Sequence, residues 1–418
     1  MKAIVISIGN ELLSGKTVNT NAAFISGKLH ELGIETLRVV TIGDDAAAIQ
    51  RQLAEAVKLA DVVITTGGLG PTHDDITKRA VTEFFGSRLV FREAILRNIE
   101  ERFHRRGVPM PAVNRNQAMV PQEAELIDNP VGTAPGILFR RRKTLIFVLP
   151  GVPREMQAMM QEFVVPFLKK QGGLEPIRVW QYRTTGIAES RIYQMCRDLL
   201  EAFRDFEVAF LPKFTGVDIR VAVKASSPNA GRFAEFETEL YRRIGTYIYT
   251  QGEEELEAVV GRLLKEKGLT IAVAESCTGG LVQDRITNVS GSSEYFWGGM
   301  VTYSNESKMR FLGVREASLK THGAVSDVVA REMAVGVRKA MGTGIGVSTT
   351  GIAGPTGATP EKPVGLIYIG LSAGDTLLAR RFVFTNDRRL NKELGAQAAL
   401  EIVRRYLLGI PIENNTTK

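Results

Sequence analysis

The chain has 418 residues, of which 44% are hydrophobic and 24% are charged, and this composition excludes a disordered protein. A chain of this length is expected to fold as about two to four domains. The net charge of +7 is compatible with anionic ligands, but for this length it does not by itself indicate nucleic acid.

Cysteine usage and hydropathy exclude further classes of protein. Cys196 and Cys277 are the only cysteines and the four histidines are scattered, which excludes a disulfide framework and a zinc motif. No apolar run reaches the ~18 residues of a membrane span, and the run Ala3–Ile8 is typical of a buried strand rather than a signal peptide. We therefore expect a reduced, cytoplasmic protein with no membrane partner.

Residues 1–170 are predicted to form the first domain, an α/β domain with a parallel sheet. The expected strands are Ala3–Ile8, Thr36–Ile42, Val62–Thr66 and Thr144–Leu149, and the expected helices are Asn19–Leu32 and Asp45–Leu59. Strands that alternate with helices in this order imply parallel strands with covering helices.

A glycine-rich segment, Thr65–Thr77, follows a predicted strand of this domain and opens a helix. Its glycines permit close approach of the backbone to a ligand, and its paired carboxylates could hold Mg²⁺ against a diphosphate. The candidate ligand-binding residues in it are Gly67, Gly68, Gly70, Thr72, Asp74 and Asp75. The alternative is that the two aspartates are only first-turn charges that stabilise the helix dipole.

Two basic runs could suggest nucleic acid. Arg140–Lys143 lies between the apolar segments Ile137–Phe139 and Thr144–Leu149, so a charged hairpin turn explains it better. Arg105 and Arg106 form the other run. Nucleic acid is therefore not an expected partner.

Residues 171–251 are predicted to form a small α+β module. Strands are expected at Ile177–Thr184, Val217–Val223 and Tyr247–Tyr249, and helices at Ala188–Phe203 and Arg232–Ile244. Val217–Val223 alternates apolar and polar residues, which predicts a half-buried strand. The module resembles a KH-type fold, but its glycines form no G-x-x-G motif, so the sequence does not support RNA clamping.

Residues 252–418 are predicted to form a third domain, again α/β, after a linker at Gln251–Glu255. Its first helix has one apolar stripe, which consists of Leu256, Val259, Val260, Leu263 and Leu264, and it ends near Gly268. Strands that alternate with helices are expected at Thr270–Ala274, Gly298–Tyr303, Gly344–Thr349, Gly365–Leu371 and Leu378–Phe384.

Three polar loops follow strands of this third domain. The first, AESCTGG, places Ser276 and backbone N–H groups before a helix, which favours anions and developing oxyanions. The alternative is that Ser276 or Thr278 merely caps that helix. The second loop contains Tyr303 and Lys308, and the third is the hydroxyl- and glycine-rich segment Ser348–Gly357. Loops at the carboxyl ends of parallel strands converge, so these indicate a Ser/Lys hydrolase for a phosphorylated small molecule.

The same segments carry a resemblance to a known family. AESCTGG, GGMVTYSNESK, HGAVS (His322–Ser326) and STTGIAGP are similar to motifs of nicotinamide mononucleotide deamidases. GGLG with the following aspartates, and LPGVPREM, resemble the molybdopterin-binding fold. Over essentially its whole length the chain resembles the CinA family, named for competence/damage-inducible protein A.

The resemblance implies roles for residues of the third domain, whose deamidase site is expected to need no cofactor. Ser276 would be the nucleophile, Lys308 its base and Tyr303 a neighbouring contact. Arg388, in FTNDRR, would bind the substrate phosphate, although Asn386 stands where the family usually has glycine. The remaining substrate-binding candidates are Thr278, Gly279, Gly280, Thr350, Gly351, Gly354 and Gly357.

For the first domain the resemblance implies hydrolysis of the ADP-ribose diphosphate with a divalent metal such as Mg²⁺. The expected metal ligands are Glu11, Asp44 and Asp75. Asn10 and Arg154 would bind the ligand together with the glycine-rich segment, and Asn19, Asn21 and Asn129–Gly136 are secondary candidates. The family also implies a homodimer.

Cys277 competes with Ser276 for the role of nucleophile, because a thiol is the more nucleophilic group in isolation. Consecutive side chains on a strand-to-helix turn diverge, so only one of them can face the ligand, and the resemblance favours Ser276. Two other functions stay open: a nucleotide-sensing adaptor linked to competence or DNA repair, and a molybdopterin-handling protein. The Ser/Tyr/Lys set argues against the first, and the fused deamidase-like domain argues against the second.

Overall fold

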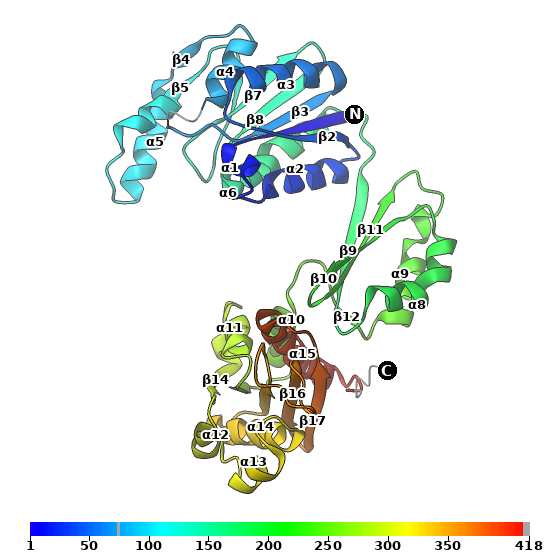
Figure 1. Ribbon diagram of the computed structural model, residues 1–418. Helices are drawn as coiled ribbons and strands as arrows, with labels where there is room; N and C mark the ends of the chain where they lie inside the picture. Colours follow the sequence, from blue (N-terminus) through cyan, green and yellow to red (C-terminus); the bar gives the residue numbers. More distant parts are fainter. Residues whose placement is uncertain (73–75, 413–418) are drawn as a thin grey trace. The chain divides into compact units, whose positions relative to one another are not determined.

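The computed structural model describes residues 1–72 and 76–412 (Figure 1). The described residues form two compact units, one within residues 1–179 together with 223–230 and the other of residues 180–222 with 231–412. The predicted α/β multidomain class is confirmed, with a parallel-sheet N-terminal domain, a small central α+β module and a C-terminal α/β domain. Among the described residues, no helix has the length and apolar character that crossing a bilayer requires.

The N-terminal domain contains a six-stranded sheet in the order β2-β1-β3-β8-β7-β6. The strands are β1 (Lys2–Ile8), β2 (Glu35–Ile42), β3 (Val62–Thr66), β6 (Glu125–Ile127), β7 (Gly136–Arg141) and β8 (Thr144–Leu149). Strands β2, β1, β3 and β8 are parallel, as predicted, while β7 and β6 are antiparallel additions.

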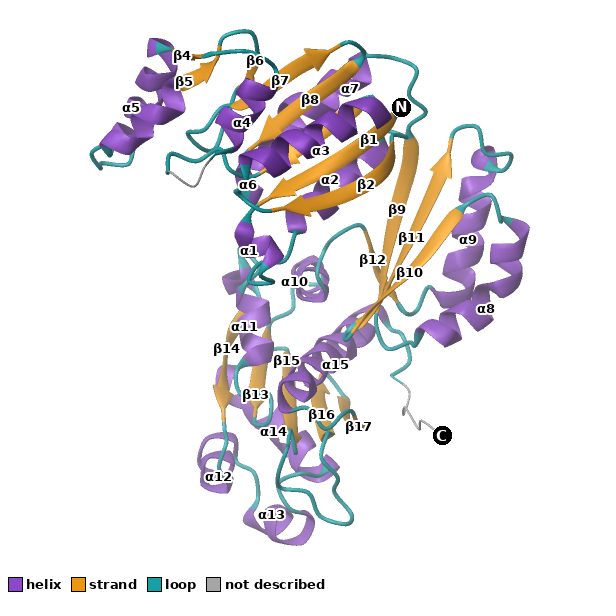
Figure 2. Cartoon of the chain, turned by 45° about the horizontal axis from the view of Figure 1, so that its top comes forward, coloured by secondary structure: helices purple, strands orange, loops and turns teal. Residues whose placement is uncertain are grey.

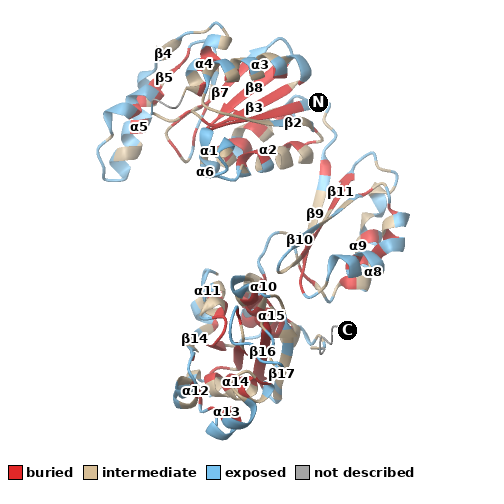
Figure 3. Ribbon diagram, viewed as in Figure 1, coloured by how far each residue is buried: buried red, intermediate tan, exposed pale blue. Residues whose placement is uncertain are grey.

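Helices cover both faces of this sheet because its central strands are apolar on both faces. Figure 3 shows these strands as largely buried. On one face pack α2 (Thr20–Glu31), α6 (Pro153–Met159) and α7 (Val165–Lys170), and on the other α3 (Ala46–Leu59) and α4 (Thr77–Phe84). The remaining α-helices and strands are α1 (Asn10–Leu13), α5 (Glu93–Arg105), and the two-stranded sheet of β4 (Leu89–Phe91) and β5 (Met119–Pro121).

The charged hairpin predicted at Arg140–Lys143 is confirmed. Arg141 of β7 pairs with Thr144 of β8, which leaves Arg142 and Lys143 as the turn. Arg142 has φ 55°, the left-handed value that such a tight turn requires. The basic run is therefore explained by local structure.

The central module has a four-stranded sheet in the order β10-β11-β9-β12 with helices α8 and α9 packed on it. Its elements are β9 (Ile177–Thr184), α8 (Glu189–Ala202), β10 (Glu207–Lys213), β11 (Gly216–Lys224), α9 (Phe233–Ile244) and β12 (Ile248–Gln251). The prediction that Val217–Val223 is half-buried is wrong, since Asp218 is only 4% exposed. Ion pairs with Arg183 and Lys213 make the burial of this carboxylate tolerable.

The C-terminal domain has a five-stranded sheet in the order β14-β13-β15-β16-β17, with helices on both faces (Figure 2). The strands are β13 (Ile271–Glu275), β14 (Phe296–Val301), β15 (Ile345–Gly351), β16 (Leu366–Ala373) and β17 (Thr376–Val383). On one face lie α10 (Leu256–Glu266), α11 (Leu281–Thr287) and α15 (Arg388–Leu408). On the other face lie α12 (Asn305–Leu312), α13 (Glu316–His322) and α14 (Asp327–Met341).

The expectation that every strand of this domain alternates with a helix is wrong after β15, since no helix lies between β15 and β16 or between β16 and β17, and both pairs are antiparallel. Strands β16 and β17 form an antiparallel hairpin whose turn contains Gly374, with φ 54°. Strands β13, β14 and β15 are parallel, so their carboxyl ends meet at one edge of the sheet.

The predicted linker Gln251–Glu255 is held by the central module. Buried Arg183 donates hydrogen bonds to the carbonyl oxygens of Glu253 and Glu254 and pairs with the Glu255 carboxylate at 2.9 Å. Buried Arg404 of α15 donates to the Thr246 carbonyl oxygen at 2.6 Å. These bonds explain why most of the central module and the C-terminal domain belong to one compact unit.

Candidate active site

The three polar loops that follow β13, β14 and β15 meet around a cavity of about 260 Å³. Ser276 and Cys277 come from the first loop, Tyr303 and Lys308 from the second, and the third supplies its glycine-rich wall. The other lining residues are Ala324, Val325, Thr350, Gly351, Ile352, Ala353, Gly354, Thr356, Gly357 and Arg388. The structure thus brings together most of the residues that the sequence singled out in this domain.

Ser276 is the first residue after β13, and its backbone N–H donates to the Thr349 carbonyl oxygen at 2.9 Å. This bond fixes the start of the loop against β15. The Ser276 hydroxyl accepts a hydrogen bond from Lys308 Nζ at 3.0 Å and is 8% exposed. A serine hydroxyl within hydrogen-bond reach of an amine has the geometry of a nucleophile with its base.

Lys308 lies on α12 and is only 1% exposed. Its Nζ also donates to the carbonyl oxygens of Thr302 at 2.8 Å and Tyr303 at 3.4 Å. These bonds hold the amine against the loop that follows β14. Burial lowers the pKa of Lys308 because desolvation disfavours the ammonium form. No carboxylate among the described residues forms an ion pair with it, so the neutral amine required of a base is accessible.

Cys277 is packed inward although it touches the cavity. It is 5% exposed and belongs to the core cluster formed by α10, α11, α15 and the sheet. Burial raises the pKa of the Cys277 thiol to about 12, and a protonated thiol is a poor nucleophile. The geometry therefore favours Ser276 over Cys277.

Glu275, which the sequence reading did not select, organises the loop that carries Ser276. Its fully buried carboxylate accepts hydrogen bonds from the backbone N–H groups of Gly280, Val282 and Gln283, and from the Thr278 hydroxyl at 2.6 Å. It therefore caps α11, whereas neither Ser276 nor Thr278 does so. The available signal was a carboxylate at the end of an apolar strand, directly before the serine.

Thr278, Gly279 and Gly280 are not brought to the cavity, although the sequence placed them in substrate binding. Thr278 is fully buried and its hydroxyl also contacts that of Thr349 at 2.6 Å. The N–H of Gly280 is already used by Glu275. These residues shape the loop rather than the cavity wall.

Arg388, the first residue of α15, also lines the cavity. It donates to the Gly354 carbonyl oxygen and to the Tyr303 hydroxyl, each at 2.8 Å, which ties together two of the converging loops. Its charge has no carboxylate partner among the described residues. Asn386 does not require glycine's conformational freedom, since Arg142 is the only described non-glycine residue with positive φ.

The third loop is fixed from the α13–α14 side. The Thr350 hydroxyl donates to the Ala324 carbonyl oxygen at 2.8 Å, and Ala324 and Val325 line the cavity. Gly354 and Gly357 have φ of 88° and 93°, which only glycine adopts readily. The HGAVS segment was noted as a motif, but its contribution to the wall could not be assigned from the sequence.

In the N-terminal domain the carboxyl ends of β1, β3 and β8 meet. A Cβ added to Gly67 would lie 2.1 Å from the Ile8 carbonyl oxygen, so close packing of the chain requires glycine there. The Asn21 amide donates to the Thr66 hydroxyl at 2.9 Å and the Gly151 carbonyl oxygen at 2.8 Å, which locks these ends together. The next residue, Gly68, has φ 65°, and the loop continues through Gly70 and Thr72.

Asn10 and Asp44 lie against each other beyond β1 and β2. The Asp44 carboxylate accepts from the Asn10 backbone N–H at 3.0 Å, and the Asn10 side-chain oxygen accepts from the Asp44 N–H at 3.3 Å. Glu11 is adjacent and exposed. Asp74 and Asp75 lie outside the described residues, and within these no group of three or more histidine, cysteine, aspartate or glutamate side chains is arranged to hold a metal ion.

The secondary candidates of this domain have structural partners. Asn19 caps α2 by accepting from the Ala22 N–H, and the buried Asn129 side chain holds its own loop through the Gly132 N–H and the Ala134 carbonyl oxygen. Arg154, in the first turn of α6, is exposed.

Comparison with known proteins identifies the domains. Residues 4–170 match the family described as "Probable molybdopterin binding domain", residues 181–250 match "Damage-inducible protein CinA KH domain", and residues 253–407 match "CinA C-terminal domain". Among solved structures, the protein CinA from Thermoplasma acidophilum is 36% identical, with 41% of this chain and 96% of that chain covered and a TM-score of 0.37.

Similar sequences span the whole chain. A CinA-like protein of Chloroherpeton thalassium is 46% identical over 97% of this chain and 99% of its own length. A CinA-like protein of Salinibacter ruber is 45% identical over 97% of this chain and 100% of its own length. The chain therefore belongs to the CinA family.

Proposed function

We propose that the C-terminal domain hydrolyses the carboxamide of nicotinamide mononucleotide to give nicotinate mononucleotide and ammonia. The observation that carries this proposal is the contact of 3.0 Å between Ser276 Oγ and Lys308 Nζ, made by a buried lysine of lowered pKa. A titratable group whose pKa is shifted by burial and which lies in a cavity is a candidate for a catalytic role.

The proposed reaction has two steps. Ser276 Oγ attacks the carboxamide carbon while Lys308 Nζ takes the hydroxyl proton. Lys308 then gives that proton to the departing ammonia, and an ester between Ser276 and the nicotinoyl carbon remains. Water, deprotonated by Lys308, cleaves the ester, and the proton returns to Ser276. The positively charged pyridinium ring withdraws electrons from its carboxamide, which makes the first attack feasible.

The direct test is incubation of the full chain with nicotinamide mononucleotide while ammonia release is followed. Nicotinamide riboside, which lacks the phosphate, is the matched control and should react poorly. A nucleotide-sensing adaptor would bind the mononucleotide without releasing ammonia, and that result would reject the proposal.

Arg388→Ala is expected to raise KM for nicotinamide mononucleotide about tenfold or more, with a smaller effect on kcat. The reason is that a phosphate contact is present in both the ground state and the transition state. Steady-state kinetics with the mononucleotide checks this. The neighbouring Arg389→Ala, which does not line the cavity, is the control. A loss confined to kcat would contradict the assignment.

We further propose that the N-terminal domain hydrolyses the diphosphate of ADP-ribose with a divalent metal. The supporting observation is that Glu11, in α1 after β1, follows Asn10, which is hydrogen-bonded to Asp44 in the segment after β2. Mg²⁺ is often held by only one or two carboxylates together with substrate phosphates and water, so this donor set fits it, with Asp75 as a further ligand. A bound metal would neutralise diphosphate charge, while Arg154 would orient the ligand.

Chelation with EDTA is expected to abolish ADP-ribose cleavage by the full chain and to leave ammonia release unchanged. The two candidate sites lie in different compact units, and the described residues of the deamidase cavity include no carboxylate. Both activities are measured on the same preparation, and Mg²⁺ should restore the first. Loss of both on chelation would mean that the deamidase also depends on a metal.

We also propose that the protein recycles pyridine nucleotides in the cytoplasm as a homodimer. Its two cysteines are buried and unpaired, which suits a reducing compartment. Light scattering after size-exclusion chromatography measures the oligomeric state, and a monomer mass would reject the dimer.

A further inference from the structure

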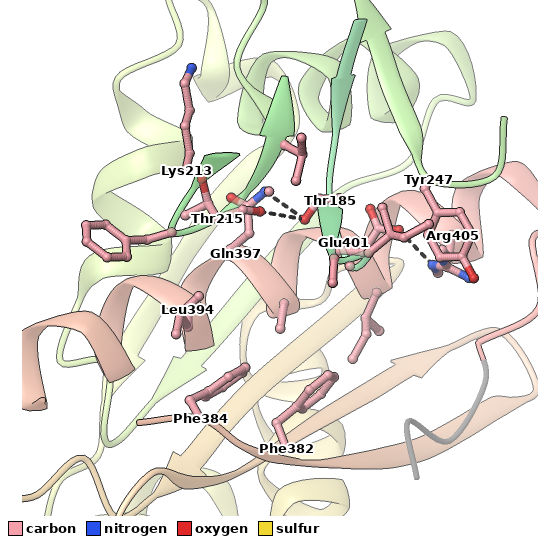
Figure 4. Close-up of a pocket in the computed structure, with 18 of the residues that line it drawn as sticks. Thr185, Lys213, Thr215, Tyr247, Phe382, Phe384, Leu394, Gln397, Glu401 and Arg405 are labelled. Carbon is pink, nitrogen blue, oxygen red and sulfur yellow. Dashed lines mark hydrogen bonds and ion pairs between the residues drawn. The ribbon is translucent and has the colours of Figure 1, made fainter. Parts of the chain in front are cut away.

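A larger cavity, separate from the candidate active site, lies between the central module and the C-terminal domain within their common unit. Its volume is about 470 Å³, within the range of about 300–1,000 Å³ that small-molecule sites occupy. The end of β9, the β10–β11 hairpin, β17 and α15 form its walls (Figure 4). It shares no residue with the wall of the deamidase cavity.

Aromatic rings form one side of this junction cavity. Phe382 and Phe384 are two residues apart in extended chain, so their side chains project from the same face. Their rings are parallel within 11°, and the ring centroids are 5.5 Å apart. Figure 4 shows both rings facing the space below Gln397. Tyr247 lies on another wall, with the Arg405 guanidinium 5.5 Å from its ring centre. Parallel rings of this kind suit stacking with a further flat ring.

The basic side chains that line the junction cavity already have partners in the protein. Lys213 pairs with Asp218 at 2.6 Å, and Arg405 pairs with Glu401 at 2.7 Å. The Arg380 guanidinium donates to the Ile412 carbonyl oxygen at 2.6 Å. A charged ligand would have to displace these contacts, so it would gain little net hydrogen bonding.

The amide of Gln397 is also satisfied at both ends. Its nitrogen donates to the Thr185 hydroxyl at 3.0 Å, and its oxygen accepts from Arg285 at 2.8 Å. Glu189 is the remaining lining carboxylate, and it is exposed at the rim. We infer that the junction cavity binds an uncharged molecule built on planar aromatic rings, held by stacking and apolar burial.

Helix α15 connects this cavity with the deamidase site. Arg388 is its first residue, and Leu394, Gln397 and Ala398 farther along the same helix line the junction cavity. An occupant would therefore contact the helix that holds the proposed phosphate-binding arginine. On the function proposed above, occupancy is expected to change KM for nicotinamide mononucleotide at least about twofold, because Arg388 acts in binding.

The test uses N-phenyl-1-naphthylamine, an uncharged aromatic probe whose fluorescence rises in apolar surroundings, with the full chain. We expect saturable binding of one equivalent. Ala398→Trp, which fills the cavity, and Phe382→Ala, which removes one ring, should each weaken binding about tenfold. Phe311→Ala, which removes an exposed phenylalanine of α12, is the matched control and should bind normally.

Unchanged probe binding by Ala398→Trp would overturn the inference, and so would equal losses in the Phe382 and Phe311 variants. Thermal melting shows whether each variant is folded. If Phe382→Ala is unstable, probe binding by Ala398→Trp alone tests whether the probe occupies the junction cavity. The anionic relative 8-anilino-1-naphthalenesulfonate should bind more weakly, and tighter binding would contradict an uncharged ligand. Probe binding does not depend on enzymatic activity, so the binding proposal can fail without the deamidase proposal, and the reverse. An unchanged KM for nicotinamide mononucleotide with saturating probe would refute the link through α15.

Discussion

Ammonia release from nicotinamide mononucleotide should fall by about 10³-fold or more when Ser276 is replaced by alanine. The expected loss is large because no other described hydroxyl lies within hydrogen-bond distance of Lys308 Nζ. The substitution removes one oxygen from a partly accessible loop, so the thermal midpoint should change little. Initial rates of ammonia production and a melting curve on the same sample provide the measurement.

Cys277→Ala is the matched control, since it changes the neighbouring residue by a single heavy atom. It should keep most of the activity, and it should cost about 1 kcal/mol of unfolding free energy because Cys277 packs in the core. An inactive Cys277→Ala beside an active Ser276→Ala would reverse the assignment of the nucleophile. Loss in both would indicate that the loop, rather than one side chain, was damaged.

Most of the fold follows from apolar periodicity. Val62–Thr66 and Thr144–Leu149 are buried along their whole length, and they read as strands because parallel strands covered on both faces are continuously apolar. The same rule locates β13 and β15, and thereby the convergence of the loops that carry Ser276 and the glycine-rich segment. Parallel topology is what makes this part of the candidate site predictable.

Contacts between polar residues that are distant in the sequence could not be predicted from apolar periodicity. Glu275 looks like the polar end of a strand, and only the folded loop shows that its buried carboxylate gathers several donors. Asp218 fits an alternating, half-exposed strand until Arg183 and Lys213 are seen to cover it. The alternation in the earlier part of this domain predicts helices after β15 and β16 as well, but antiparallel neighbours can be joined without a crossover helix.

The buried position of Lys308 is itself informative about function. Burying an amine without a carboxylate partner costs stability, and such costs persist where a perturbed pKa serves chemistry. A pure adaptor would need no such group, since binding a nucleotide requires the phosphate contact and the cavity shape alone. Lys308 is therefore the residue whose replacement best separates an enzyme from a sensor.

Lys308→Met is expected to lower kcat for ammonia release about 10²–10⁴-fold, with little change in KM, because a base acts in the transition state. Methionine preserves the length and apolar stem of the side chain, so the cavity should survive. Isothermal titration with nicotinate mononucleotide measures whether binding is retained. A variant that keeps kcat but loses affinity would show that Lys308 binds the substrate and is not the base.

The dependence of kcat on pH is a further test of Lys308 as the base. The neutral amine is the active form, and burial lowers the pKa of Lys308, so kcat should rise with pH and level off below the ordinary lysine value of 10.5. In the unfolded chain the Lys308 amine binds its proton more tightly than in the folded protein. Raising the pH towards 10.5 should therefore increase the free energy of unfolding of the protein with Lys308 relative to that of Lys308→Met. Urea unfolding across this range measures the difference, and a trend in the opposite direction would mean that the pKa of Lys308 is raised in the folded protein.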